Sequence, residues 1–227
     1  AITDYRAIHP NLGSRIDFQN LIHKVHEQGM LIIIDVVLNH MAVDSVYSES
    51  NPDYIKKNSD GTLFRKEHDW WDIVDLNLNN HDLWEDISSI LKYWVDIGID
   101  GFRCDVASLV PIEFWRFLKS NIDHVNQLLW IAESVHPSYM KEMRKRGHNC
   151  LSEAELHEIF DITYDYDSYE IFSQISQENP VSDGYIQFIN RHMSFYPDNA
   201  IKLRFLENHD IQRAASLFLD LDQLQNW

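Results

Sequence analysis

The chain has 227 residues, of which 44% are hydrophobic and 12% aromatic, and this composition excludes a mostly disordered protein. It carries 36 Asp and Glu against 19 Lys and Arg, a net charge of -17, which argues against nucleic acid and anionic membrane surfaces as partners because both are negatively charged. The two cysteines, Cys104 and Cys150, are too few for a disulfide framework. We expect one large domain with a sizeable core, or a core plus a small insert.

The first predicted unit is a helix followed by a strand. Residues 17–28 space their apolar side chains as a helix does, with Asp17 as the expected N-cap and Gly29 as the terminator. Residues 30–38 form a nearly continuous apolar run that is rich in Ile and Val and too short for a typical helix. This run predicts a strand buried on both faces.

Helix and strand patterns alternate along the rest of the chain. The predicted strands cover residues 101–107, 128–134, 159–164 and 201–207, and the predicted helices cover residues 83–97, 111–122, 138–146, 166–178, 181–194 and 211–219. This alternation predicts a parallel α/β architecture with right-handed crossovers. The polar region 43–80 interrupts it, and we interpret that region as a short inserted subdomain between parts 1–42 and 81–227 of a single domain.

The predicted strands end in carboxylates, imidazoles and a guanidinium. Functional groups gather at the carboxyl ends of strands in α/β folds, so these side chains are the candidate site. They are Asp35, Asn39 and His40 at the end of the first strand, Arg103 and Asp105 in the second, Glu133 at the end of the third, and Glu207, His209 and Asp210 at the end of the last.

The spacing of three of these residues has a chemical meaning. Arg103 and Asp105 are two residues apart in a strand, so both point to one face and the guanidinium can hold the carboxylate ionised. Glu133 follows apolar residues, and such a setting raises the pKa of a carboxyl group so that it can act as a general acid. Glycosidases use a pair of carboxyl groups of this kind.

Four segments then reveal a resemblance. The segments DVVLNH (35–40), GFRCD (101–105), AES (132–134) and FLENHD (205–210) resemble, in this order, the signature segments of the α-amylase family, glycoside hydrolase family 13. Two weaker similarities, DLN at 75–77 and YRAIHPNLG at 5–13, extend the resemblance over nearly the whole chain. It implies a parallel (β/α)8 TIM-type barrel, incomplete in this chain, which we expect to begin after the second barrel strand and to stop before the eighth.

The resemblance also implies a role for each strand-end residue. Asp105 would be the nucleophile, Glu133 the acid/base and Asp210 the stabiliser of the transition state. The sugar would be bound by His40 and His209, while Arg103 would orient Asp105.

Two further roles follow from the same resemblance. Asp35 would brace Arg103, and Asn39 matches a position that often binds a structural calcium ion in that family. The chemistry itself would require no cofactor. The implied reaction is retaining hydrolysis of α-glucosidic bonds, mainly α-1,4, in starch-like substrates or malto-oligosaccharides.

Other interpretations stay open at this point. Arg103 with Asp105 could be a structural ion pair, both histidines could be core residues, and Asn39 could be an ordinary hydrogen-bonding loop residue. Trp70 and Trp71 could either stack on sugar rings or pack the insert.

The alternatives for function are a transglycosylase with the same site, a silent carbohydrate-binding homologue, and a metal-dependent hydrolase. The ligands of such a metal would be His40, His209, Asp35 and Asp210. The open sheet edges of an incomplete barrel predict a homodimer. Compartment and substrate length are left open.

Overall fold

The computed structural model describes residues 1–67, 69–122, 128–175 and 183–217. Five parallel strands form the main sheet, in the order β1, β4, β5, β6 and β7. Their bounds are Ile33–Val37, Gly101–Asp105, Leu129–Ala132, Ile162–Tyr164 and Ile201–Leu203. Each strand pairs with the next one along the chain in this series, so the predicted parallel α/β architecture is confirmed.

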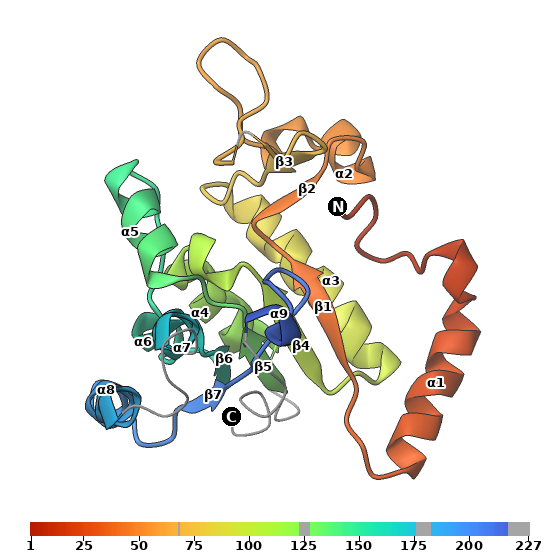
Figure 1. Ribbon diagram of the computed structural model, residues 1–227. Helices are drawn as coiled ribbons and strands as arrows, with labels where there is room; N and C mark the ends of the chain where they lie inside the picture. Colours follow the sequence, from red (N-terminus) through yellow and green to blue (C-terminus); the bar gives the residue numbers. More distant parts are fainter. Residues whose placement is uncertain (68, 123–127, 176–182, 218–227) are drawn as a thin grey trace.

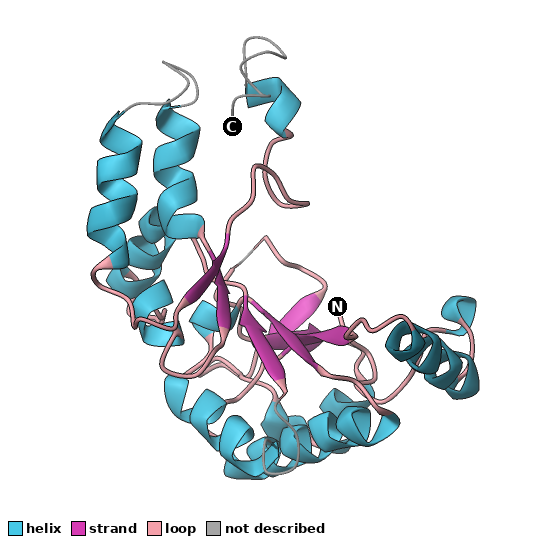
Figure 2. Cartoon of the chain, turned by 90° about the horizontal axis from the view of Figure 1, so that it is seen from below, coloured by secondary structure: helices cyan, strands magenta, loops and turns pink. Residues whose placement is uncertain are grey.

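Helices connect the strands and lie in an arc around the outside of the sheet (Figures 1 and 2). They are α1 (Arg15–Glu27), α3 (His81–Ile97), α4 (Ile112–Ile122), α5 (Pro137–Lys145), α6 (Glu153–Leu156), α7 (Tyr166–Ile175) and α8 (Asp183–Met193), and the short helix α9 (Ala214–Leu217) follows β7 outside this arc (Figure 2). Short 3-10 helices cover Pro10–Leu12, Pro52–Tyr54 and Ala107–Leu109. The predicted helical residues 176–178, 181–182 and 218–219 lie outside the described residues. No helix among the described residues is both long and apolar enough to span a membrane.

The core lies between the sheet and the helices that cover it. Phe102 of β4 and Trp130 of β5 pack with ring centroids 5.1 Å apart, and Trp115 of α4 closes the same layer. All three side chains are fully buried. Gly101 begins β4 where a Cβ atom would lie 2.1 Å from the carbonyl oxygen of Leu129, so only glycine lets the two strands approach this closely.

Two expectations from the sequence were wrong in detail. The N-cap of α1 is Ser14, and Asp17 is its capping-box partner at the third helical position, because each side chain accepts a hydrogen bond from the other residue's backbone N–H. The first strand is not buried on both faces: among its residues only Val36 is buried, and Asp35 is exposed. The reason is that β1 is an edge strand, bonded only to β4 within the described part of the chain.

The polar region after β1 forms a small layer of its own above the carboxyl end of that strand (Figure 1). Its antiparallel strands are β2 (His40–Ala42) and β3 (Ile73–Asp75), and the helix α2 (Val46–Ser50) follows β2. The small sheet therefore already begins at His40. We call residues 40–80 the insert. Its position over the end of β1 places it beside the carboxyl ends of the neighbouring strands.

Candidate active site

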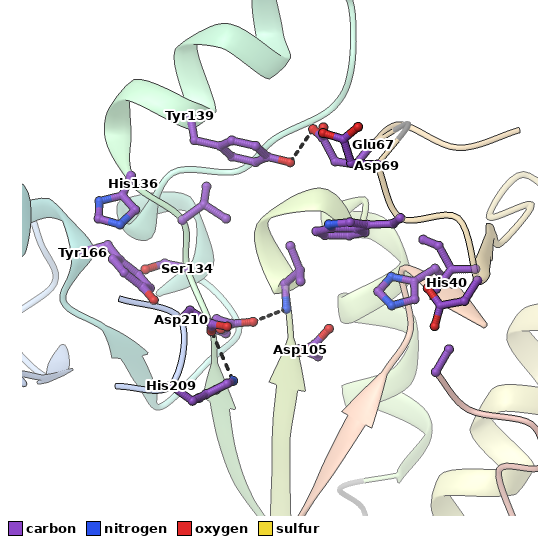
Figure 3. Close-up of a pocket in the computed structure, with 17 residues that line it drawn as sticks. His40, Glu67, Asp69, Asp105, Ser134, His136, Tyr139, Tyr166, His209 and Asp210 are labelled. Atoms are coloured by element: carbon purple, nitrogen blue, oxygen red, sulfur yellow. Dashed lines mark hydrogen bonds and ion pairs between the residues drawn. The ribbon is translucent and has the colours of Figure 1, made fainter. Parts of the chain in front are cut away.

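A cavity of about 700 Å³ opens at the carboxyl ends of β1, β4 and β5 (Figure 3). Parallel strands bring their carboxyl ends to one edge of the sheet, so residues far apart in sequence meet there. The predicted residues that line the cavity are His40, Asp105, Glu133, His209 and Asp210. Segments from the insert and from the start of α5 also line the cavity.

The guanidinium of Arg103 is the centre of the charge arrangement. Its Nη1 donates hydrogen bonds to Asp105 Oδ1 at 2.7 Å and to Asp35 Oδ1 at 2.9 Å. Its Nη2 lies 2.7 Å from Glu133 Oε1, an ion pair without the alignment of a hydrogen bond. One cation therefore contacts both candidate catalytic carboxyl groups and the bracing carboxylate that the sequence suggested.

These contacts change the acidity of the groups involved. Burial lowers the pKa of Arg103, but the charges of Glu133 and Asp35 outweigh that effect and raise it above its usual value. Burial raises the pKa of Glu133 to about 7, and this effect exceeds the lowering by the Val106 N–H and by Arg103. Glu133 therefore keeps its proton to a higher pH than a carboxyl group with a pKa near 4.5.

The turn after Asp105 adds a backbone donor to the site. Val106 has φ 42° and ψ 43°, which places it in the left-handed region. Its N–H donates a hydrogen bond of 2.7 Å to Glu133 Oε2. Both oxygens of Glu133 are therefore held, one by this N–H and the other by Arg103, and the carboxyl group has a fixed orientation toward the cavity.

The residues after β7 reach the cavity from a loop, because β7 ends at Leu203. His209 Nε2 lies 3.2 Å from Asp210 Oδ2, and the two side chains are 73% and 52% exposed. Glu207 points elsewhere and accepts a hydrogen bond from the N–H of Ala214 at the start of α9. Of the carboxylates in this segment, only Asp210 lines the cavity together with Asp105 and Glu133.

His40 and Asn39 lie where β1 meets the insert. His40 lines the cavity, and burial lowers its pKa below the usual value despite the nearby carboxylates. Its Nδ1 lies 3.1 Å from Asn39 Nδ2. Asn39 Oδ1 accepts a hydrogen bond from Lys66 Nζ of the insert, so this oxygen already has a cationic partner.

Strand-end reasoning missed several residues that line the cavity. His136 and Tyr139 follow β5, Tyr166 follows β6, and Glu67 belongs to the insert. Tyr139 donates a hydrogen bond of 2.8 Å to Glu67 Oε1, so α5 and the insert meet across the cavity (Figure 3). Functional groups gather at the carboxyl ends of strands, and this rule predicted Glu133. His136 and Tyr166 follow strands closely, so the same rule predicts them once the residues after each strand are included. Glu67 had no such signal, because its place depends on how the insert folds back.

Trp70 is the tryptophan of the insert that reaches the cavity. Its ring centroid lies 5.4 Å from that of His40, and it lines the cavity, whereas Trp71 is exposed on the surface. The alternative of a metal-dependent hydrolase finds no support in these positions: the described residues contain no group of three or more His, Cys, Asp and Glu side chains that could hold a metal ion.

The arrangement can carry out acid/base and nucleophilic chemistry on a neutral ligand. Asp105 is paired with a guanidinium, while burial raises the pKa of Glu133 to about 7, which favours the form that can donate a proton. A carboxylate paired with a cation, beside a second carboxyl group whose pKa is raised, is the kind of pair that cleavage of a glycosidic bond uses.

Comparison with known proteins places the chain in a family. The model of the alpha amylase catalytic domain matches residues 1–72 and 58–226. Alpha-amylase 3 of Dictyoglomus thermophilum is 27% identical over 96% of this chain and 47% of its own length. An alpha-1,4-glucan:maltose-1-phosphate maltosyltransferase of Picrophilus torridus is 28% identical over 70% of the chain and 28% of its own length.

Solved structures show the same fold. An alpha-amylase from Lactobacillus plantarum is 39% identical with a TM-score of 0.92, and the match covers 97% of this chain and 52% of that one. A noncanonic maltogenic alpha-amylase, AmyB from Thermotoga neapolitana, is 38% identical with a TM-score of 0.81, over 99% of this chain and 49% of that one. The chain thus spans about half the length of these structures, and its five-stranded parallel sheet is part of a TIM barrel. The chain belongs to the alpha-amylase catalytic-domain family.

Proposed function

We propose that this chain carries the active site of a retaining glycoside hydrolase that cleaves α-glucosidic bonds, mainly α-1,4, in malto-oligosaccharides or starch-like glucans. The observation that carries the proposal is the contact of one guanidinium, Arg103, with both Asp105 and Glu133 at the wall of the cavity. The family and the named activities of its relatives support the substrate class.

The first step would be attack of Asp105 on the anomeric carbon. Arg103 binds Oδ1 of Asp105, so Oδ2 is the oxygen that we expect to form the bond. Glu133 gives its proton to the departing glycosidic oxygen as that bond breaks, and a glycosyl ester of Asp105 forms with inversion. The ionised Glu133 then takes a proton from water, and the water oxygen attacks the same carbon with a second inversion, which breaks the ester bond and releases Asp105 as a carboxylate.

Several neighbours would stabilise the charge that develops in these steps. Asp210 lies at the open side of the cavity with His209, where both can bind sugar hydroxyl groups. His40 lies in the cavity wall on the insert side. Asp35 holds Arg103 from behind and keeps the guanidinium in place between the two carboxyl groups.

The test is hydrolysis of an activated maltoside by the full-length gene product, with the product anomers followed by NMR. We expect the α-anomer to form first, and we expect Asp105→Asn to abolish turnover. The exposed Asp96→Asn on α3 is the matched control and should keep wild-type activity. First release of the β-anomer would contradict retention, and full turnover by Asp105→Asn would remove it as the nucleophile.

Transfer to a sugar acceptor is the second candidate, because one relative is a maltosyltransferase. The same two steps serve both reactions, with a sugar hydroxyl in place of water. Adding maltose to the assay separates them: longer products would show transfer, and free glucose or maltose alone would show hydrolysis. The expected homodimer stays a prediction for sedimentation measurements.

A further inference from the structure

Three segments of the chain meet at the ammonium group of Lys66. Its Nζ donates hydrogen bonds of 2.7 Å to Asn39 Oδ1, at the end of β1, and of 2.7 Å to Asp75 Oδ2, on β3. The side chain of Lys66 is 12% exposed and that of Asp75 is 1% exposed. This largely buried cation therefore joins the residues after β1 to two parts of the insert.

Asn39 Oδ1 and Asp75 Oδ2 are oxygen ligands of the kind found in metal sites, but the group that lies between them is the ammonium group of Lys66. An amide oxygen and a carboxylate oxygen are donors that a hard divalent cation prefers, and such an ion needs about six to eight of them. Here the ammonium group already lies between the two oxygens at hydrogen-bond distance. Its positive charge would repel a second cation, so the residues present do not fit the calcium ion suggested for Asn39.

The same contact decides how the amide of Asn39 is oriented. An ammonium group can only donate hydrogen bonds, so the atom of Asn39 that faces it must be the oxygen. The nitrogen of the amide then faces His40, and Asn39 Nδ2 lies 3.1 Å from His40 Nδ1. An amide nitrogen also can only donate, so Nδ1 must accept and the ring hydrogen must be on Nε2.

We infer that Lys66 takes the place of a structural metal ion between the sheet and the insert, and that through Asn39 it fixes the hydrogen of His40 on Nε2. Lys66 is thus a positioning residue that acts on His40. For the proposed function, on which this last point rests, His40 becomes a hydrogen-bond donor to the sugar.

The closing experiment has two readouts that need no turnover. The first is thermal unfolding of the full-length gene product in EDTA and in CaCl₂, for which we expect equal Tm values. The second is the tautomer of His40 from histidine-selective ¹⁵N NMR, for which we expect the hydrogen on Nε2. Neither readout involves substrate. The inference about Lys66 can therefore fail while the proposed function holds, and the proposed function can fail while the inference holds.

Variants sharpen both readouts. Lys66→Met should lower Tm by roughly 5–10 °C, because the carboxylate of Asp75 stays buried without a partner. It should also give a mixture of His40 tautomers. Lys57→Met is the matched control, since it removes the same charge from an exposed position in the insert, and it should change neither readout.

Three results would overturn the inference. A Tm that falls in EDTA and recovers with CaCl₂ would show a bound structural ion. If the ring hydrogen of His40 is on Nδ1 in the wild type, Lys66 does not fix it on Nε2 through Asn39. If the tautomer of His40 is unchanged in Lys66→Met, Lys66 does not determine where the ring hydrogen lies. If this variant does not fold, the two wild-type measurements still decide the question.

Discussion

Val106 donates its backbone N–H to Glu133 Oε2 at 2.7 Å while it holds a left-handed conformation with φ 42°. Among the described residues it is the one non-glycine residue with a positive φ. A β-branched residue pays roughly 1–3 kcal/mol for this conformation, and such strain gathers at functional sites. The turn therefore links the residue after Asp105 directly to Glu133, the other candidate catalytic carboxyl group.

The pH dependence of activity is the first prediction. Burial raises the pKa of Glu133 to about 7, and a general acid must be protonated to donate. We expect kcat/KM on an activated maltoside to fall as pH rises through about 7. Glu142 is exposed on α5, and Glu142→Gln should leave the fall of kcat/KM with rising pH unchanged. A rate that stays level up to pH 9 would contradict the assignment of Glu133 as the acid.

The same shift in pKa predicts how stability depends on pH. The pKa of Glu133 rises from 4.5 in the unfolded chain to about 7 in the folded protein, so the folded state binds the proton more tightly. Its stabilising contribution, on the order of 3 kcal/mol, is complete below pH 4.5 and is lost as pH rises through 7. Glu133→Gln does not ionise, so its Tm relative to wild type should increase from pH 5 to pH 9. A constant difference in Tm over this range would be evidence against the shift.

A buried cluster of one lysine and two carboxyl groups gives a third prediction. Lys202 of β7 contacts Glu153 at 2.7 Å and Asp165 at 2.9 Å, and all three side chains are at most 3% exposed. Lys202→Met should lower the free energy of unfolding by about 3–5 kcal/mol, because it leaves the buried carboxyl group of Glu153 without its cation, whereas Asp165 keeps Arg204. Arg116→Met breaks an exposed pair with Glu158 and should cost less than about 1 kcal/mol. Urea titration measures the free energy of unfolding of both variants. Equal losses would show that burial does not determine how much each ion pair contributes to stability.

The contact between the insert and α5 predicts an effect on substrate choice. Glu67 Oε1 accepts hydrogen bonds from Tyr139 at 2.8 Å and from Arg146 Nη1 at 3.1 Å, and Glu67 and Tyr139 both line the cavity. Tyr139→Phe removes one of these bonds and loosens the contact across the cavity. We expect the ratio of kcat/KM for maltoheptaose to that for maltotriose to rise.

The control for this variant is Lys141→Ala, an exposed residue of the same helix, which should leave the ratio at its wild-type value. If Tyr139→Phe also leaves the ratio unchanged, the contact does not limit substrate length. A fall in kcat/KM by the same factor for both substrates would indicate a general loss of geometry at the site.

Much of this protein follows from its sequence. Apolar runs at strand spacing and amphipathic helices alternate, and this pattern alone predicts a parallel sheet covered by helices. The positions of Asp105 and Glu133 at strand ends, and the apolar residues before Glu133, predict which carboxyl group is held ionised and which is held protonated. These features are local in the chain, so periodicity and neighbouring residue types determine them.

The tertiary structure decided what local patterns could not. The contact of Lys66 with Asn39 joins residues from separate segments, as does the contact of Glu67 with Tyr139, and both depend on how the insert folds over the sheet. The exposure of β1 depends on its place at the sheet edge, since the same apolar run would be buried in a central strand. Hydrogen bonds and burial of this kind are fixed by distances between distant segments, which residue spacing along one chain does not contain.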